Sequence, residues 1–297
     1  GKAKALIHLL SKSFYAKLLA VFRVTNNKGG NTPGVDKIVW SNPADKLKAA
    51  LNLKTRGYQT KPLRRIYILK KNGKKRPLSI PVMHDRAMQT LYKMAIEPMA
   101  ETVADPNSYG FRPRRSCNDA MEQCFLSLCR DMSAQWVFEA DIKGCFDNIR
   151  HEWILKNIPI NKTILKKWLK SGYIEQKRLF PTKRGTPQGG TISPLIMNMV
   201  LDGLETIIMK KFPRWKRQKV NFIRYADDFV ITAIDRQTIT NHIIPLVKEF
   251  LAERGLELSP EKSKITHINQ GFNFLSQNVR KYKGKLLIHP SKEAVQS

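Results

Sequence analysis

The stretch from residue 222 to residue 231 constrains this chain most, because it places two adjacent carboxylates inside an apolar segment. Apolar residues precede and follow Asp227 and Asp228, which predicts two short buried strands joined by a tight turn. Carboxylates this close raise each other's pKa unless a cation neutralises them. A divalent metal such as Mg²⁺, which typically takes one or two carboxylates together with substrate phosphates, would do so. The alternative is an ordinary hairpin turn, since Asp is a favoured turn residue.

The net charge indicates a polyanionic partner. The 297 residues include 53 Lys and Arg against 24 Asp and Glu, which gives a formal net charge of +29. Hydrophobic residues make up 42% of the sequence, which indicates a folded core rather than a basic disordered tail. A folded protein with this excess of positive charge most often binds RNA or DNA.

A membrane surface is the alternative partner. The sequence has no run of about eighteen apolar residues, no signal-peptide pattern and no lipidation site, so we expect a soluble, cytoplasmic protein that does not bind membranes. The four cysteines form no CxxC pair and have no His cluster near them. We therefore expect reduced cysteines, with neither a zinc site nor a disulfide framework.

Periodicity and capping signals predict most of the helices. Apolar spacing predicts a helix over 3–22, with Leu6, Leu9, Leu10, Phe14, Leu18 and Phe22 on one side. A further helix is expected with Asn42 as N-cap and Pro43 as its first residue. Others are expected over 85–101, over 117–129 with Ser116 as N-cap, and from 193 to about 209. In the last of these, Ser193 is the predicted N-cap and Pro194 the first helical residue.

Residues 54–76 contain ten Lys or Arg and no acidic residue. Strand-like segments at 65–69 and 76–80, joined by Asn72-Gly73, predict a hairpin. Such a hairpin suits contact with phosphate, of a nucleic acid or of a nucleoside triphosphate. The alternative is a solvated edge hairpin that its lysines protect from aggregation.

Two other segments carry candidate binding residues. The loop 109–116 combines two aromatics with Arg112, Arg114 and Arg115, which could stack on bases and hold phosphates. Residues 162–184 form another basic face. The candidate RNA-binding residues are Lys54, Arg56, Lys61, Arg64, Arg65, Arg112, Arg114, Arg115, Lys166, Lys167 and Lys170.

Residues 136–149 read as a buried strand that ends in Asp141 and turns through Gly144 into a helix. A carboxylate at a strand end is a rigid way to present a metal ligand. Asp141 could equally serve as a turn or capping residue. The segment 185–195 has three glycines that would let backbone approach a ligand, with a flexible linker as the alternative.

Taken together, these segments resemble the reverse transcriptase region of group II intron-encoded proteins, the maturases of retroelement introns. The matching motifs occur in the family's order: Asn31-Thr32-Pro33-Gly34-Val35-Asp36, Arg76-Pro77-Leu78-Ser79-Ile80-Pro81, Tyr109-Gly110-Phe111-Arg112-Pro113, Asp141-Ile142-Lys143-Gly144-Cys145-Phe146-Asp147, Gly185-Thr186-Pro187-Gln188-Gly189-Gly190, Tyr225-Ala226-Asp227-Asp228, residues 256–264 and Gly271-Phe272-Asn273-Phe274-Leu275. The match covers nearly the whole chain.

The resemblance implies an α+β fold, the fingers and palm of a right-hand polymerase. The palm would be a split βαβ antiparallel sheet packed on helices. Residues 1–40 would form an N-terminal extension, 41–135 the fingers and 136–297 the palm, with a segment near 160–190 contributing to the fingers. No thumb, DNA-binding or endonuclease region is present, so we expect a truncated chain.

The resemblance also assigns roles to residues. Asp141, Asp227 and Asp228 would be catalytic, and with Ile142 would bind two Mg²⁺ ions, for which Mn²⁺ is a possible substitute. Phe146 would be the sugar gate that favours dNTPs. Lys70, Arg76 and Gln188 would contact the incoming nucleotide, and Phe274 and Leu275 would form the primer grip. Ser276 departs from the glycine common at that position, which weakens the primer-grip assignment.

Two function classes follow, and they are compatible. The first is an RNA-directed DNA polymerase that uses an RNA template, a DNA primer and dNTPs. The second is an RNA-binding cofactor that assists splicing of a structured intron RNA, with catalysis dispensable. A standalone relative without an intron is a further alternative. The expected location is the cytoplasm of a bacterial host, with an organelle as the alternative, and the oligomeric state stays open.

Overall fold

The computed structural model describes residues 2–69, 73 and 75–296. The chain divides into two compact units, each made of two separate stretches. The first unit contains residues 1–103 and 146–199, and the second contains 104–145 and 200–297. The predicted boundaries at 40 and 135 stay predictions, because compactness alone does not assign a stretch to fingers or palm.

The first unit combines helices with a small mixed sheet. Its helices are α1 (Lys2–Lys12), α2 (Phe14–Thr25), α3 (Pro43–Asn52), α4 (Met83–Val103), α7 (His151–Asn157) and α8 (Lys162–Leu169), while α6 (Cys145–Asn148) and α9 (Ser193–Leu201) lie at its boundaries. The sheet has the order β2 (Lys75–Ile80), β1 (Leu63–Leu69), β4 (Tyr173–Glu175), β5 (Arg178–Phe180). Strands β1 and β4 are parallel, and the other pairs are antiparallel.

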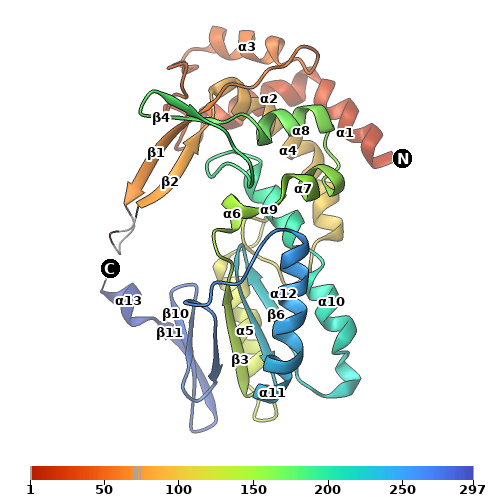
Figure 1. Ribbon diagram of the computed structural model, residues 1–297, viewed down its shortest axis with the longest axis vertical. Helices are drawn as coiled ribbons and strands as arrows, with labels where there is room; N and C mark the ends of the chain where they lie inside the picture. The colour runs from red at the N-terminus through yellow and green to blue at the C-terminus, as the bar shows by residue number, and fades with distance from the viewer. Residues whose placement is uncertain (1, 70–72, 74, 297) are drawn as a thin grey trace. The chain divides into compact units, whose positions relative to one another are not determined.

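The predicted basic hairpin is present as β1 and β2 (Figure 1). Its register pairs Ile66 with Leu78 and Leu69 with Lys75. Of the predicted turn, Asn72 lies outside the described residues, and Gly73 has a φ of 75°. A positive φ suits glycine, in agreement with the predicted Asn-Gly turn.

The predicted helix 3–22 is wrong, because the segment forms two helices. Ser13 has extended backbone (φ −61°, ψ 128°), and its hydroxyl accepts a hydrogen bond from Ala16 N–H at 3.4 Å, so that it caps α2. The helical phase therefore restarts at Phe14. The face predicted from a single helix is largely exposed, whereas Ile7, Val21 and Val24 are buried.

Helices α3, α4 and α5 (Cys117–Leu128) agree with the sequence. Asn42 caps α3 by accepting from Asp45 N–H at 2.8 Å, with Pro43 as the first residue. Ser116 caps α5 in a reciprocal capping box with Asp119. The helix predicted over 193–209 is instead two helices, α9 and α10 (Leu204–Lys211), since Gly203 has a φ of 95°. In α9, Ser193 is already helical rather than a cap.

The second unit is organised around a four-stranded antiparallel sheet with the order β6 (Asn221–Tyr225), β7 (Asp228–Ala233), β3 (Trp136–Asp141), β8 (Lys264–His267). Its other elements are α5, α10, η1 (Arg214–Lys216), α11 (Arg236–Thr238), the π-helical η2 (Ile239–Ile243), α12 (Ile244–Glu253), β9 (Phe272–Phe274), β10 (Gln277–Tyr282), β11 (Lys285–Pro290) and α13 (Lys292–Val295). Strands β7 and β8, joined by α12, lie on either side of β3. This is the split βαβ arrangement, so the predicted sheet is confirmed.

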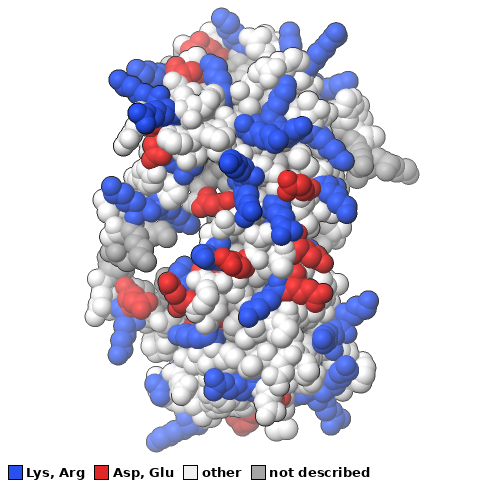
Figure 2. Space-filling view, in the orientation of Figure 1, with Lys and Arg blue, Asp and Glu red and all other residues white. Residues whose placement is uncertain are grey.

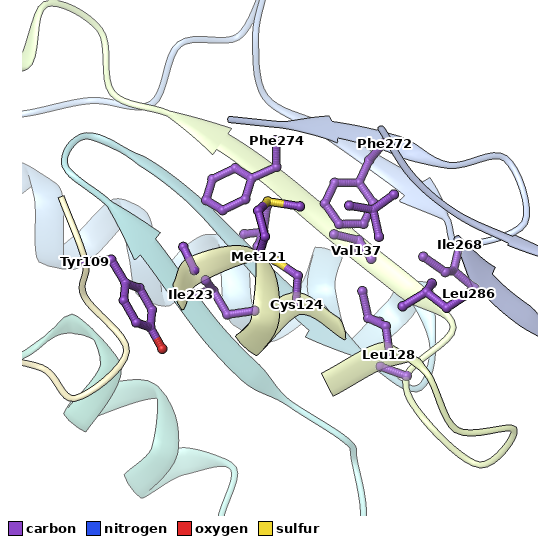
Figure 3. Close-up of a cluster of buried hydrophobic side chains, with 14 residues drawn as sticks. Tyr109, Met121, Cys124, Leu128, Val137, Ile223, Ile268, Phe272, Phe274 and Leu286 are labelled. Carbon is purple, nitrogen blue, oxygen red and sulfur yellow. The ribbon is translucent and has the colours of Figure 1, made fainter. Parts of the chain in front are cut away.

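One face of this sheet packs on α5 and on the smaller sheet β11-β10-β9. Figure 3 shows Met121, Cys124 and Leu128 of α5 beside Val137 and Ile223 of the large sheet. Because strand side chains alternate, the neighbours Phe138, Phe222 and Phe229 are buried on the opposite face. A sheet covered on both faces holds its strand ends rigidly, and Asp141 and Asp228 lie at such ends.

Among the described residues, no single helix is long and apolar enough to cross a membrane. The helical segments Ala5–Lys12 and Phe14–Thr25 reach that length and apolar composition only together, and they are bent by 72° relative to each other.

Candidate active site

The hairpin β6–β7 presents two carboxylates at one end of the large sheet. Tyr225 pairs with Asp228, so Ala226 and Asp227 form the two-residue turn. Ala226 has a φ of 58°, a left-handed conformation that costs an alanine about 1 kcal/mol. The predicted tight turn between buried strands is confirmed.

The loop that contains Gly110 lies directly against this turn. A Cβ on Gly110 would stand 2.3 Å from the backbone nitrogen of Ala226, which is closer than real Cβ contacts. Next to it, Tyr109 N–H donates to the Arg224 carbonyl at 2.8 Å, and Arg224 N–H donates to the Asn107 carbonyl at 2.9 Å. The loop thus adds backbone hydrogen bonds to β6 just before the turn.

Asp141 joins the two turn carboxylates from another strand. It is the last residue of β3 and pairs directly with Asp228 of β7. Directly opposed residues on antiparallel strands have Cβ atoms about 5 Å apart. Asp141, Asp227 and Asp228 therefore lie at the same end of one sheet, although they are far apart in the sequence.

These carboxylates interact strongly with one another. Surrounding protein atoms, followed by the negative charges of Asp227 and Asp141, raise the pKa of Asp228 to about 7. Asp228 itself remains exposed to solvent, so we attribute the direction of this shift chiefly to its carboxylate neighbours. Lys262 opposes it: its Nζ lies 2.9 Å from Asp141 Oδ2, and the pair raises the pKa of Lys262.

A cavity of about 420 Å³ opens beside this cluster. Asp141, Asp228 and Lys262 line it together with Phe274 and Leu275, the two residues predicted for the primer grip. The β9–β10 turn that carries them has Leu275 and Ser276 at φ 51° and 65°. Glycine adopts this left-handed region without cost, which accounts physically for the glycine common at the position of Ser276.

Glu139 is a further carboxylate of this cavity, two residues before Asp141 on β3. Burial raises its pKa, while Lys264 and Thr266 act in the opposite direction. Thr266 Oγ1 donates to Glu139 Oε1 at 2.9 Å, and Lys264 Nζ lies 3.5 Å from the same oxygen. Unlike Asp228, Glu139 therefore has its charge balanced by protein groups.

The donor chemistry of the cluster fits Mg²⁺, which prefers carboxylate oxygens and takes few of them from a protein. Within the described part of the chain, no three His, Cys, Asp or Glu side chains converge closely enough to bind a metal by themselves. A site completed by substrate phosphates does not need such a group. The side chain of Ile142 is buried and apolar, so this residue could contribute only its main-chain carbonyl.

Behind the turn, Arg224 is fully buried with 0% exposure. Its Nη2 lies 2.5 Å from Asp202 Oδ1, and its Nη1 donates to the Ala226 carbonyl at 3.3 Å. Burial raises the pKa of Asp202 to about 6, against the opposing effect of Arg224. The ion pair thus links the turn that carries Asp227 to the segment between α9 and α10.

The residues predicted to bind the nucleotide lie in the first unit. Phe146 is half-buried in α6, and its carbonyl accepts from Thr186 N–H at 2.6 Å. Gln188 Nε2 donates to Asp147 Oδ2 at 2.9 Å, and the Gln188 carbonyl accepts from Ser79 N–H. Lys70 lies outside the described residues.

A cavity of about 290 Å³ in this unit is lined by Arg65, Ser79, Asp147 and Gln188, among others. Burial raises the pKa of Asp147, while Arg65, Gln188 and Arg76 lower it. The Arg65 guanidinium also stacks on Tyr173, 3.9 Å from the ring centroid. Gln188 is thus held in place between strand β2 and Asp147.

The predicted RNA-binding residues fall into two groups. Lys54, Arg56, Lys61, Arg114, Lys166 and Lys170 are exposed, and Arg64 and Arg65 are half-buried. For Arg112 the prediction is wrong: it is 7% exposed and donates to the carbonyls of Asp105 and Ser108. Arg115 donates hydrogen bonds to the carbonyls of Pro106 and Ser108. Lys167 donates to the carbonyl of Tyr58.

Sequence reasoning missed Lys262, Glu139 and the Arg224–Asp202 pair. Two signals were available: Arg224 itself, because a charge inside an apolar strand needs a buried partner, and the motif at 256–264, which contains Lys262. Glu139 meets Lys264 through the pairing of β3 with β8, which has no local signature.

The sequence profile of the reverse transcriptase (RNA-dependent DNA polymerase) family matches residues 68–279, and that of the N-terminal domain of reverse transcriptase matches residues 1–53. The chain belongs to the reverse transcriptase family. This confirms the resemblance inferred from the ordered motifs.

Curated relatives of this reverse transcriptase include proteins of group II introns. It is 32% identical to protein YkfC of Escherichia coli K12, over 86% of this chain and 78% of that protein. It is 31% identical to group II intron-encoded protein LtrA of Lactococcus lactis, over 92% of this chain and 56% of that protein. This reverse transcriptase therefore spans little more than half the length of LtrA.

Solved structures support the fold. Telomerase from Candida albicans, solved with the TWJ fragment of telomeric RNA, matches with a TM-score of 0.59 and 13% identity, over 82% of this chain and 48% of that chain. Apo telomerase from Candida tropicalis matches with a TM-score of 0.54 and 14% identity, over 76% of this chain and 48% of that chain. At this identity the likeness concerns the fold alone, which agrees with the predicted fingers and palm.

Proposed function

We propose that this chain catalyses RNA-directed DNA synthesis for a group II intron, adding dNTPs to a primer 3′-OH on an RNA template. The observation that carries the proposal is the direct pairing of Asp141 with Asp228 at the sheet end where the turn presents Asp227. Three carboxylates gathered there, with one facing lysine, leave an excess of negative charge that a divalent cation would offset.

Asp141, Asp227 and Asp228, with the main-chain carbonyl of Ile142, would hold two Mg²⁺ ions, for which Mn²⁺ could substitute. Bound there, such ions would lower the pKa of the primer hydroxyl and neutralise charge on the triphosphate and leaving pyrophosphate. The protein's own contribution is to fix the ligands on paired strands, so that their geometry does not have to form during the reaction.

Other residues would bind and orient the substrates. Phe274 and Leu275 line the carboxylate cavity, which supports a role in positioning the primer end. In the first unit, the hydrogen bond from Gln188 to Asp147 preorganises the amide for the incoming nucleotide. Arg76 would contact the triphosphate, as would Lys70, and Phe146 would exclude a ribose 2′-hydroxyl by steric contact.

A second function, assistance to intron splicing, is favoured by the net charge of +29 and by relatives such as LtrA and the putative COX1/OXI3 intron 2 protein of Saccharomyces cerevisiae. The exposed cations of the first unit, among them Lys54, Arg56 and Lys170, would contact the backbone of a structured intron RNA. Such contacts recognise shape more than base sequence.

The test is single-nucleotide addition to a DNA primer annealed to RNA, with dNTP or rNTP in the presence of Mg²⁺. The wild-type chain should add dNTP, and Asp227→Asn should abolish addition while it retains RNA affinity, because the substitution removes a metal ligand and leaves the basic surfaces unchanged. Addition by the Asp227→Asn variant would contradict the proposed metal site.

If the wild-type chain adds nothing, the same assay on a chain extended beyond Ser297 decides between the two functions. Activity that appears only in the longer chain supports the polymerase. Continued inactivity combined with tight intron binding favours the splicing role.

A further inference from the structure

The connection between α10 and β6 is an acid-free, exposed surface that neither function above uses. Residues 210–219 contain six cations and no Asp or Glu: Lys210, Lys211, Arg214, Lys216, Arg217 and Lys219. All six are exposed. Figure 2 shows Lys and Arg side chains gathered over the lower end of α10 and the turn that follows it. We call residues 210–219 the basic turn.

Trp215 lies at the centre of the basic turn with 76% of its surface exposed, more than any other aromatic among the described residues of the second unit. Tryptophan is enriched at binding interfaces, because its ring offers a large apolar area and its N–H a hydrogen-bond donor. Lys216 Nζ lies 5.5 Å from the Trp215 ring centroid. The ring therefore has a cation beside it and cations on both sides along the chain.

The exposure of Trp215 does not come from a loose loop. Phe212 is buried, 6.4 Å from the ring of His242 between centroids. The Lys219 carbonyl accepts from Thr232 Oγ1 at 2.9 Å and from Asn221 Nδ2 at 3.2 Å, and the Gln218 carbonyl accepts from Ile234 N–H at 2.9 Å. Both ends of the turn are thus fixed to the second unit.

The backbone of the turn is also held in an unfavourable conformation. Arg217 and Lys219 both have a φ of 54°, the left-handed region that non-glycine residues avoid. Such strain persists only where surrounding contacts impose it, and it tends to occur at binding sites.

The basic turn lies at the opposite end of the sheet from the carboxylates. It leads into Asn221, the first residue of β6, whereas Tyr225 at the other end of that strand precedes the catalytic turn. A strand rises about 3.3 Å per residue, which separates the two ends of β6 by roughly 13 Å. A ligand on Trp215 would therefore be distinct from a primer end held at Asp141 and Asp228.

We propose that the basic turn is a binding site for unpaired RNA, in which one base stacks on Trp215 and the adjoining phosphates contact Arg214, Lys216 and Arg217. An aromatic ring between cations suits this ligand, because every base offers a flat face and every linkage a negative charge. A membrane-binding segment would need a broader apolar face, whereas the residues next to Trp215 are charged. The site goes beyond nucleotide addition and gives the chain a separate contact with RNA.

Affinity for a single-stranded oligoadenylate of about twelve nucleotides tests the stacking. Loss of one stacked base typically lowers affinity about 5- to 150-fold, so we expect a reduction in that range for Trp215→Ala. Trp215→Phe, which keeps an aromatic face, should recover most of the affinity. The RNA should quench tryptophan fluorescence in the wild-type chain and much less in Trp215→Phe.

A salt series separates stacking from charge. For a single strand, the slope of log affinity against log salt changes by about 0.7 for each phosphate contact. Arg214→Gln combined with Arg217→Gln should therefore reduce the slope by about 1.4, whereas Trp215→Ala should leave the slope unchanged. The matched control is Lys283→Gln with Lys285→Gln, which removes two exposed lysines from the β10–β11 turn of the same unit and should leave the slope unchanged.

Wild-type affinity of Trp215→Ala at every salt concentration would overturn the proposal. An equal loss of slope in the control pair would also overturn it, since the effect would then be general charge. If Trp215→Ala loses binding to anionic lipid vesicles and keeps binding to the oligonucleotide, the surface contacts membranes and the RNA site is wrong. These outcomes do not depend on catalysis, so they are distinguishable from failure of the Asp227→Asn test.

Discussion

Each unit holds a carboxylate whose pKa is raised, and the charged groups beside the two carboxylates differ in sign. Asp147 in the first unit lies near Arg65 and Arg76, which lower its pKa, and accepts a hydrogen bond from Gln188. Asp228 in the second unit faces Asp227 and Asp141, which raise its pKa further, to about 7. Asp147 thus has cationic side chains beside it, whereas two of the groups around Asp228 are themselves carboxylates. This difference in neighbouring charge favours Asp228 over Asp147 as a ligand of the proposed metal ions.

The largest expected loss of activity follows from substitution of Asp228. Asp228→Asn should reduce nucleotide addition by about 10³-fold or more, since bound cations supply several kcal/mol of transition-state stabilisation. The same substitution should raise the free energy of unfolding in a metal chelator by about 1 kcal/mol, because it removes like-charge repulsion. Primer extension and denaturant unfolding measure the two effects. A variant that loses both activity and stability would show that Asp228 has a structural role.

The Arg224–Asp202 pair shows that the second unit can balance a charge internally. Removing one partner of a buried ion pair typically costs about 3 kcal/mol or more. Arg224→Met should therefore lower the free energy of unfolding by about that amount, as denaturant unfolding would show. The double variant Arg224→Met/Asp202→Leu should recover part of the loss, since neither charge is then left alone. No recovery would mean that the hydrogen bond from Arg224 to the Ala226 carbonyl, rather than the charge of Arg224, dominates.

Substitution of Phe146, which lies in the first unit, should have a smaller effect, on the choice between dNTP and rNTP. Phe146→Ala should reduce the preference for dNTP over rNTP by about tenfold to a hundredfold, in line with the discrimination that steric contact provides. The measurement is the ratio of kcat/KM for the two nucleotides. Phe22→Ala, which removes an exposed ring from α2, is the control and should leave the ratio unchanged. An unchanged ratio in Phe146→Ala would refute the sugar gate.

The smallest effect on the kinetics of nucleotide addition should come from substitution of Asp147. Asp147→Asn keeps an oxygen that can accept the hydrogen bond from Gln188 and removes only a charge that two arginines already oppose. Interactions of this kind are worth up to about 1 kcal/mol, so KM for dNTP should change by less than about fivefold, with kcat unchanged. Steady-state kinetics would check this. A loss as large as that of Asp228→Asn would place Asp147 among the metal ligands.

The sequence predicted the features that depend on local chemistry. The Asp227 turn, the β1–β2 hairpin and the caps at Asn42 and Ser116 follow from residue types at fixed spacing. The ordered motifs added what spacing cannot provide, namely that Asp141 and Asp228 meet.

Features that depend on tertiary contacts were not predictable. Ser13 looks like any polar residue in an amphipathic pattern, yet its hydroxyl caps a new helix and shifts the buried face. Arg112 resembles an RNA-binding residue, but the carbonyls of Asp105 and Ser108 surround it. In both cases the deciding partner is a backbone group, whose position depends on the fold rather than on sequence pattern.

The contact between Gly110 and Ala226 has a consequence for how this enzyme can change over evolution. Any side chain at position 110 would place a carbon 2.3 Å from the Ala226 nitrogen and displace the turn that carries Asp227. A saturation library at position 110, selected for activity, should therefore return glycine. Variants with other residues would have to acquire a compensating change in the turn first. Substitutions in the loop around Gly110 and in the β6–β7 turn are therefore expected to depend on each other.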